Sequence, residues 1–457
     1  MVLAVINLID FLGDIPEWKR YHTVDEIHEK IDNIAKEYPG KIKYIDLGKS
    51  TKGESIECLK VGDGKYNALI HGFPNSEEPI GGNLLLYLAR RLAEEKDIRE
   101  ELDYNWYLIG CSDPDGARLN EGFQLGPHTP LNFSRNYYRT PTRLTPEWCF
   151  PFRFGPLDLN NPVPETRALM KLMDQIEFHF ISSLHMMKWG GITYQVPHSC
   201  PELYAPLWNS ARKFNIFLRK RPAPTVAPGV SKAYYLTVAR GYLRQWASGN
   251  ENIEPINGCY IYEYGQMLNP HLFMMIPECC LWYDPRMWDD TPTNKPLGDS
   301  LQYAYNVTTK TESFMLGIWE RALPNLKSNN PFKVMIAEMM KPLQIRYTNV
   351  SNPPLSFNEN VHTRNATVAE KIAVEGRELS FRMTHLGGLK RVFDKELKHN
   401  SNSKIEKLRD EVQDKLIEYD RRLHADYDVT INPIRNNVGA CISAILNSAI
   451  YAKNRQP

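Results

Sequence analysis

The chain has 457 residues, of which 42% are hydrophobic and 24% are charged, and its formal net charge is +1. These values are typical of a globular protein, and the balanced charge argues against nucleic-acid and membrane partners. Residues 1–13 are apolar, but they contain Asp10, lack a basic start and are too short to span a bilayer. They predict a buried or partner-facing N-terminal segment.

The eight cysteines show no zinc-binding spacing, and several lie in apolar, strand-like runs. In a chain without an export signal, such residues are expected to be free buried thiols, so we expect a cytoplasmic location. They are Cys58, Cys111, Cys149, Cys200, Cys259, Cys279, Cys280 and Cys441.

The first elements are a helix and three strands. Apolar residues recur every three or four positions after the Thr23–Glu26 capping box, which predicts a helix that ends near Tyr38. Strands are expected at residues 41–47, 55–61 and 66–73. A further helix begins at Pro79 and runs to about Glu95.

The next elements alternate in the same way. Residues 105–111 predict a strand that ends in a strong turn signal, Asp113-Pro-Asp-Gly116. Residues 117–155 show no sustained period, and so long a loop is usually functional. A helix at 164–173 and a strand at 178–184 follow. This alternation predicts an α/β sheet that is covered on both faces.

The second half is less regular. Residues 190–270 predict one helix, around 232–248, before a strand at 272–276 and a helix at 300–323. Prolines and asparagines in 324–360 indicate a domain boundary. The helical tail has an apolar face that we expect to pack on neighbouring helices or on a second subunit. This face consists of Ile405, Leu408, Val412, Leu416, Tyr419 and Leu423.

The segment 71–81 joins a predicted strand to a predicted helix. It carries one imidazole, one amide and two carboxylates, on His71, Asn75, Glu77 and Glu78. In open α/β folds, ligands bind where strands end in such turns. This loop is therefore the first candidate for a metal site.

Seven segments, in order along the chain, resemble the metallocarboxypeptidase family, zinc enzymes that remove C-terminal residues from peptides. They are 21–26, 47–53, 72–81, 113–116, Arg135-Asn136, 183–185 and Glu278. The resemblance implies a mixed, twisted sheet of about eight strands with helices on both faces. We expect an N-terminal segment at 1–20, a carboxypeptidase-like domain at 21–325, and a boundary segment with a helical C-terminal extension at 326–457.

The family's metal site is a His-x-x-Glu motif with a later histidine, which leaves a fourth zinc position for water. By resemblance, Glu78 matches the glutamate and His185 the later histidine, but Asn75 stands in place of the first histidine. An amide oxygen is a weaker and harder ligand that suits Ca²⁺ or Mg²⁺ better than zinc. We therefore expect weakened zinc binding, with His71 as a candidate substitute ligand.

The resemblance also implies catalytic and substrate-binding residues. Glu278 matches the general base. Its sequence context is apolar, where an unpaired carboxylate would be costly in free energy. Arg135, followed by Asn136, matches the group that binds the substrate's terminal carboxylate. Arg118 matches a group that polarises the scissile carbonyl. The family's substrate-side tyrosine has four candidates, Tyr194, Tyr260, Tyr262 and Tyr264.

Two hypotheses about function follow. The first is a metal-dependent carboxypeptidase or amidohydrolase that cleaves a small peptide or acyl-amino acid with a free carboxylate. The second is a catalytically inactive relative that has lost zinc and acts as a binding or assembly partner, with the C-terminal helices as a surface for a homo-oligomer. The two hypotheses differ in whether the site at Asn75 binds a metal.

Overall fold

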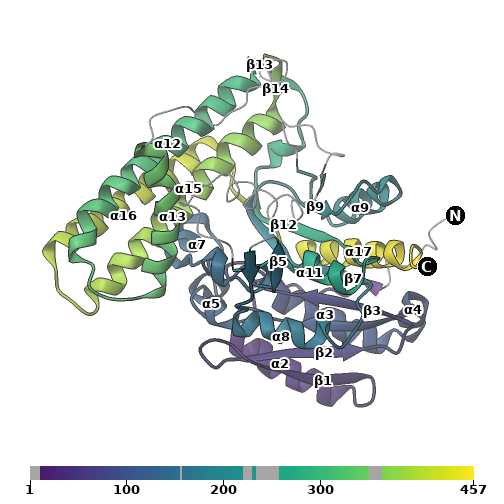
Figure 1. Cartoon of the computed structure of the whole chain (residues 1–457). Coiled ribbons are helices and arrows are strands. Elements are labelled where there is room, and N and C mark those ends of the chain that lie inside the picture. The colour runs from purple at the N-terminus through teal and green to yellow at the C-terminus, as the bar shows by residue number, and fades with distance from the viewer. Residues whose placement is uncertain (1–10, 155–156, 220–228, 233–256, 349–362) are drawn as a thin grey trace.

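The computed structural model describes residues 11–154, 157–219, 229–232, 257–348 and 363–457 (Figure 1). Most of the helix predicted around 232–248, and residues 1–10 of the apolar N-terminal segment, lie outside these ranges. The rest of that segment packs against the core through Phe11, Leu12 and Ile15, as expected for a buried segment.

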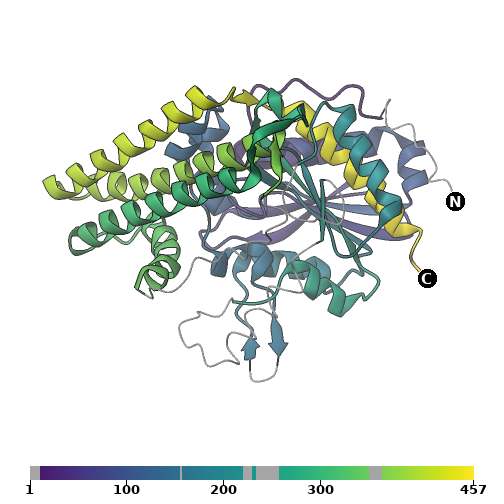
Figure 2. The ribbon, with the colours of Figure 1, turned by 90° about the horizontal axis from the view of Figure 1, so that it is seen from above.

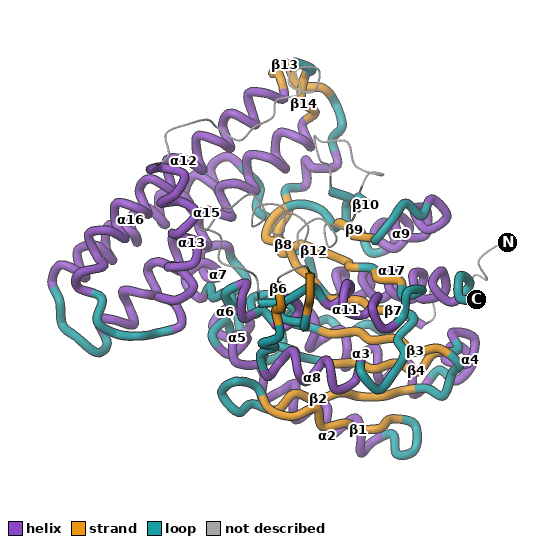
Figure 3. Tube along the Cα trace, viewed as in Figure 1, coloured by secondary structure: helices purple, strands orange, loops and turns teal. Residues whose placement is uncertain are grey.

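A mixed β-sheet forms the centre of the fold (Figure 3). Six strands lie in the order β1–β2–β4–β3–β7–β11, in which the β1–β2 and β2–β4 pairs are antiparallel and the other pairs are parallel. The predicted strands before residue 112 are confirmed. The six strands are β1 (Ile42–Lys49), β2 (Ser55–Val61), β3 (Tyr66–His71), β4 (Tyr104–Ile109), β7 (Phe180–Ser183) and β11 (Phe273–Met274).

A second group of strands continues this sheet. It has the order β10–β9–β12–β15, and β8 also pairs with β12. One residue, Leu184, separates β7 from β8, and Met275 separates β11 from β12. Since Phe273 pairs with Phe180 and Glu278 with His185, the same parallel register continues through the break. The members are β8 (His185–Trp189), β9 (Thr193–Val196), β10 (Val230–Lys232), β12 (Ile276–Tyr283) and β15 (Thr430–Ile431).

Helices cover both faces of the sheet, as predicted (Figures 1 and 2). Alternate residues of β3 point to opposite faces, so Ala68 and Ile70 belong to one core and Leu69 to the other. The larger core includes α2 (Val24–Glu37), α3 (Ile80–Glu94), α9 (Pro201–Lys213) and α17 (Ile434–Lys453). The smaller core includes α8 (Pro164–Met173) and α11 (Ile261–Leu268).

Four further helices form a bundle that extends from one side of the sheet (Figure 2). They are α12 (Leu297–Ala322), α13 (Pro331–Thr348), α15 (Val368–Leu397) and α16 (Ser403–Asp426). After α16, the chain returns to the sheet through β15 and α17. The bundle is therefore inserted between β12 and α17, and the predicted boundary at 325–326 falls inside it.

The apolar face of α16 is buried within the chain, in the same core as α12 and α15. This face therefore packs on neighbouring helices of the same chain. It leaves no exposed apolar surface on which a second subunit could pack. Helix α13 occupies residues that predicted only a boundary. Among the described residues, no helix has both the length and the apolar character that a membrane span requires.

The segment predicted as a long loop contains several short helical turns. They are α5 (Pro114–Arg118), α6 (Glu121–Gln124), α7 (Pro130–Asn136), η1 (Thr142–Leu144) and η2 (Pro146–Trp148). The elements that remain are α4 (Lys96–Leu102), β5 (Phe152–Phe154), β6 (Leu157–Leu159), η3 (Pro285–Trp288), β13 (Pro292–Pro296), η4 (Leu323–Asn325) and β14 (Asn365–Thr367).

The bundle is joined to the sheet domain by a close approach of α15 to α7. A Cβ atom added at Gly387 would lie 1.8 Å from the Ser134 carbonyl oxygen, whereas one added at Gly317 on α12 would meet nothing within 4 Å.

We expect Gly387→Ala to lower the free energy of unfolding by about 1–3 kcal/mol through overpacking. Gly317→Ala, the control, should be neutral or stabilising, because alanine favours helix. Urea unfolding of both variants measures this, and equal stability would contradict the packing described.

Candidate metal and substrate site

A cavity of about 740 Å³ opens where the sheet changes from β7 to β8. The loop after β3 contributes Asn75 and Glu78 to its lining, and the strands beyond the break contribute His185 and Glu278. These four residues were predicted from sequence as metal ligands and general base, and the fold brings them together.

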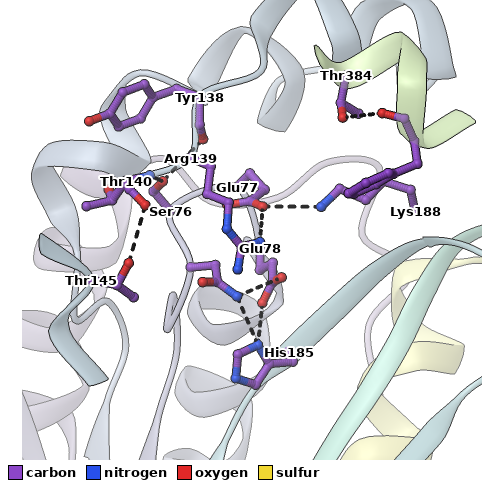
Figure 4. A network of polar contacts seen from close by, with 12 residues as sticks. Ser76, Glu77, Glu78, Tyr138, Arg139, Thr140, Thr145, His185, Lys188 and Thr384 are labelled. Carbon is purple, nitrogen blue, oxygen red and sulfur yellow. Dashed lines mark hydrogen bonds and ion pairs between the residues drawn. The ribbon is translucent and has the colours of Figure 1, made fainter. Parts of the chain in front are cut away.

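Glu78 and His185 face each other (Figure 4), and Asn75 contacts both of them. The His185 Nδ1 atom lies 2.8 Å from Glu78 Oε2, and the Asn75 amide nitrogen lies 3.0 Å from Glu78 Oε1 and 3.1 Å from His185 Nδ1. The loop that holds Asn75 and Glu78 is tight, since the Glu78 N–H donates to the Asn75 carbonyl oxygen. All three side chains are at most slightly exposed to solvent.

A second carboxylate holds the far side of the His185 ring. Glu147 Oε1 lies 3.2 Å from His185 Nε2, and the Tyr260 hydroxyl donates to Glu147 Oε2 at 3.0 Å. Burial disfavours the charged form of His185, but Glu147 and Glu78 outweigh burial and raise the pKa of His185 well above its usual range. Glu147 thus orients the ring so that Nδ1 points at Asn75 and Glu78.

This donor set fits a metal ion. A carboxylate and an imidazole are ligands that zinc takes in proteins, and a carboxylate behind the imidazole is the usual support for such a ligand. The two ends of an amide have the same shape, so rotation by 180° brings the Asn75 oxygen to the same point. In the described ranges, no three His, Cys, Asp or Glu side chains gather around a metal position. A site here therefore needs the Asn75 amide.

Glu278 stands beside His185 across the β8–β12 pair and lines the same cavity. Its Oε2 atom accepts a hydrogen bond from the Gln195 amide at 3.3 Å. The residues that follow it, Cys279 and Cys280, are buried on the strand. Glu278 is partly exposed, so its carboxylate remains accessible to a ligand in the cavity.

His71 does not substitute for the missing histidine. It is fully buried on β3, where its Nε2 atom lies 2.7 Å from Ser183 Oγ and its Nδ1 atom 3.3 Å from Ser112 Oγ. Burial lowers the pKa of His71 to about 4. Both ring nitrogens are thus engaged between neighbouring strands rather than in the cavity.

The predicted substrate-binding residues are not among those that line the cavity. Arg135 is exposed on α7, and the amide of Asn136 on the same helix donates to Asn132. Arg118 is paired with Glu54 at 2.5 Å and Asp25 at 2.7 Å. The sequence pattern located the segment that carries these arginines, but not the direction in which each side chain points.

Arg139 and Lys188 line the cavity instead, and neither was predicted. Both contact Glu77 Oε1, at 2.8 Å and 3.2 Å, from two sides above Glu78 and His185 (Figure 4). Burial disfavours the charged form of Glu77, but the two cations outweigh it and lower the pKa of Glu77. Glu77 is therefore a structural carboxylate that fixes two cations at the cavity wall.

Of the four candidate tyrosines, Tyr260 lines the cavity. Tyr194 and Tyr262 are buried, and the Tyr264 hydroxyl donates to Asp174 at 2.5 Å. The bundle supplies another wall of the cavity, which sequence reasoning missed because it lies beyond the resemblance. This wall consists of Leu301, Ala304, Ala373, Val374, Arg377, Glu378 and Phe381.

Comparison with known proteins identifies the group to which this site belongs. The model of the zinc carboxypeptidase family, Peptidase_M14, matches residues 27–278, more than half of the chain. The chain belongs to the zinc carboxypeptidase family. The match begins in α2 and ends at Glu278, so it includes Asn75, Glu78 and His185 and excludes the bundle. Family membership implies zinc as the metal.

Individual relatives are distant from this chain. Zinc carboxypeptidase A 1 of Anopheles gambiae is 27% identical over 105 residues, which are 22% of this chain and 24% of the relative, so the match spans about a quarter of that protein. Carboxypeptidase B of Astacus astacus is 28% identical over 214 residues, 41% of this chain and 70% of the relative. The carboxypeptidase A structure from Helicoverpa armigera has a TM-score of 0.37 and 12% identity, covering 60% of this chain and 70% of that chain.

A buried hydrogen-bond network links the residues around Arg139 to the loop that carries Asn75 and Glu78. The Asp113 carboxylate accepts from the Thr140 hydroxyl, and the Thr140 N–H donates to Ser76 Oγ at 3.0 Å. The Ser76 hydroxyl in turn lies 3.2 Å from the Tyr138 carbonyl oxygen. The turn predicted at Asp113 is thus the start of α5, and it also positions the cavity wall.

Burial raises the pKa of Asp113 to about 7. The folded chain then binds a proton that the unfolded chain releases, so the free energy of unfolding should fall between about pH 4 and pH 7, by up to ~1.4 kcal/mol per pH unit. Asp113→Asn keeps an acceptor for the Gly116 N–H and should reduce this slope. Asp414→Asn, an exposed change on α16, serves as control. Urea unfolding across pH 4–8 measures the slopes, and an unchanged slope in Asp113→Asn would contradict the assignment.

Proposed function

We propose that this chain is a metal-dependent carboxypeptidase or amidohydrolase that cleaves an amide bond in a small peptide or acyl-amino acid with a free carboxylate. The observation that carries the proposal is the convergence of Asn75, Glu78 and His185 beside Glu278 in one cavity. Family membership supports the reaction type.

Each residue has a distinct role in this proposal. Asn75, Glu78 and His185 hold the metal, which when bound supplies a Lewis acid that polarises the scissile carbonyl and acidifies water. Glu278 takes a proton from the attacking water and delivers it to the leaving amine. Glu147 keeps the His185 ring in place. The cavity is large enough for a small peptide, and α12 and α15 restrict its far side.

A second candidate function is ligand binding without hydrolysis. The observation that favours it is the direct pairing of Glu78 with His185 at 2.8 Å, together with the hydrogen bond that the Asn75 amide donates to Glu78, because these contacts satisfy both groups without a metal. Metal content distinguishes the two functions, because the binding function needs none.

We also propose a cytoplasmic location, which is supported by the absence of disulfides among the eight buried cysteines.

Glu278→Gln tests the proposed reaction. Removal of a general base should lower the rate of hydrolysis by about 10²- to 10⁴-fold, while zinc content stays unchanged because Glu278 is not a ligand. Glu29→Gln on the exposed side of α2 is the matched control and should retain full activity. Hydrolysis of N-acyl dipeptides and elemental analysis of each purified protein give the two readouts. A folded wild-type protein without bound metal, or a fully active Glu278→Gln variant, would refute the proposal.

A further inference from the structure

The inserted bundle places one arginine in the wall of the cavity. Arg377 lies on α15, with Ala373, Val374 and Phe381 on the same lining face, and it is exposed to solvent. Its guanidinium lies 6.0 Å from the centre of the Phe381 ring. Within the part of the chain that the structure describes, the Arg377 guanidinium makes no hydrogen bond and no ion pair. All five of its N–H donors therefore face solvent or a ligand.

The position of Arg377 relative to the metal ligands is fixed by tight packing. Helix α15 lies against β8, the strand that begins with His185. The Trp189 indole N–H donates to the Ile372 carbonyl oxygen at 3.1 Å, and a Cβ atom added at Gly376 would lie 2.7 Å from the Trp189 ring. Gly376 directly precedes Arg377. The contact of Gly376 with Trp189 therefore also fixes the backbone position of Arg377.

The other cations of the cavity already have partners. Lys188 and Arg139 share the Glu77 carboxylate, and an Arg219 N–H donates to the Met187 sulfur at 2.6 Å. The acidic neighbour of Arg377 does not neutralise it either. The Glu378 carboxylate accepts hydrogen bonds from both Arg382 and Thr308.

We infer that Arg377, supplied by the inserted bundle, binds a carboxylate of the substrate. This inference rests on the proposed function for its substrate class, and it assigns the anchoring role that Arg135 cannot fill from its place on α7. A guanidinium matches a carboxylate through two parallel N–H···O bonds, which give both affinity and orientation. The carboxylate is either the terminal one or that of an acidic C-terminal side chain, because both present the same group.

Equilibrium binding to the full chain tests this inference without turnover. In a Glu278→Gln background, three ligands are titrated by calorimetry: N-acetyl-alanyl-phenylalanine, its C-terminal amide, and N-acetyl-alanyl-glutamate with an amidated C-terminus. A ligand with the recognised carboxylate should bind about tenfold or more tighter than the phenylalanine amide, as expected for a charged hydrogen-bonded pair. Preference for the first ligand identifies the terminal carboxylate, and preference for the third identifies the side-chain carboxylate.

Arg377→Ala should abolish this preference, and Arg377→Lys should retain part of it, because lysine keeps the charge but not the fork. Arg421→Ala is the matched control, since Arg421 is also exposed in the bundle and does not line the cavity. It should leave the preference intact. A preference that survives Arg377→Ala, or no preference while Arg377 is present, would overturn the inference. Both results are independent of hydrolysis, which separately tests the proposed function.

Discussion

The site depends on one interaction, the clamping of the His185 ring between Glu78 and Glu147 at the break in the sheet. At the start of β8, the imidazole of His185 meets the carboxylate of Glu78 from the loop after β3. Burial of three ionisable groups would be costly if any of them lacked a partner. The clamp satisfies them, and the Asn75 amide lies 3.1 Å from His185 Nδ1. The amide of Asn75 is thus accommodated within the contacts that hold Glu78 and His185.

The inserted bundle adds a wall to the cavity of this family site. Helices α12 and α15 form a wall of the cavity, and close contacts of Gly376 with Trp189 and of Gly387 with Ser134 fix α15 in place. The family match ends at Glu278, so this wall is a feature of the chain rather than of the shared domain. Arg377, Arg139 and Lys188 place cationic groups in the wall of this cavity. The acidic residues Glu78 and Glu278 line the same cavity.

Local sequence patterns predicted the sheet well, because strand alternation, helix period and capping signals act over a few residues. They located β1 to β4, α2, α3 and α8, and the order of short motifs brought out Asn75, Glu78, His185 and Glu278 as a group. They failed where the outcome depends on contacts between distant segments. Nothing local separates Arg135 from Arg139, four residues later, and no motif links Glu147 or Arg377 to His185. Helix α13 was missed because its prolines and flanking asparagines indicated a boundary.

The zinc affinity of Asn75→His tests most directly whether Asn75 occupies the third ligand position of a zinc carboxypeptidase site. If it does, an imidazole in place of the amide should tighten zinc binding by about tenfold or more, which corresponds to about 1.4 kcal/mol of binding free energy. Asn454→His, an exposed change after α17, is the control and should have no effect. Competition with a chromophoric chelator measures all three affinities. A zinc affinity of Asn75→His equal to that of the wild type would contradict the account.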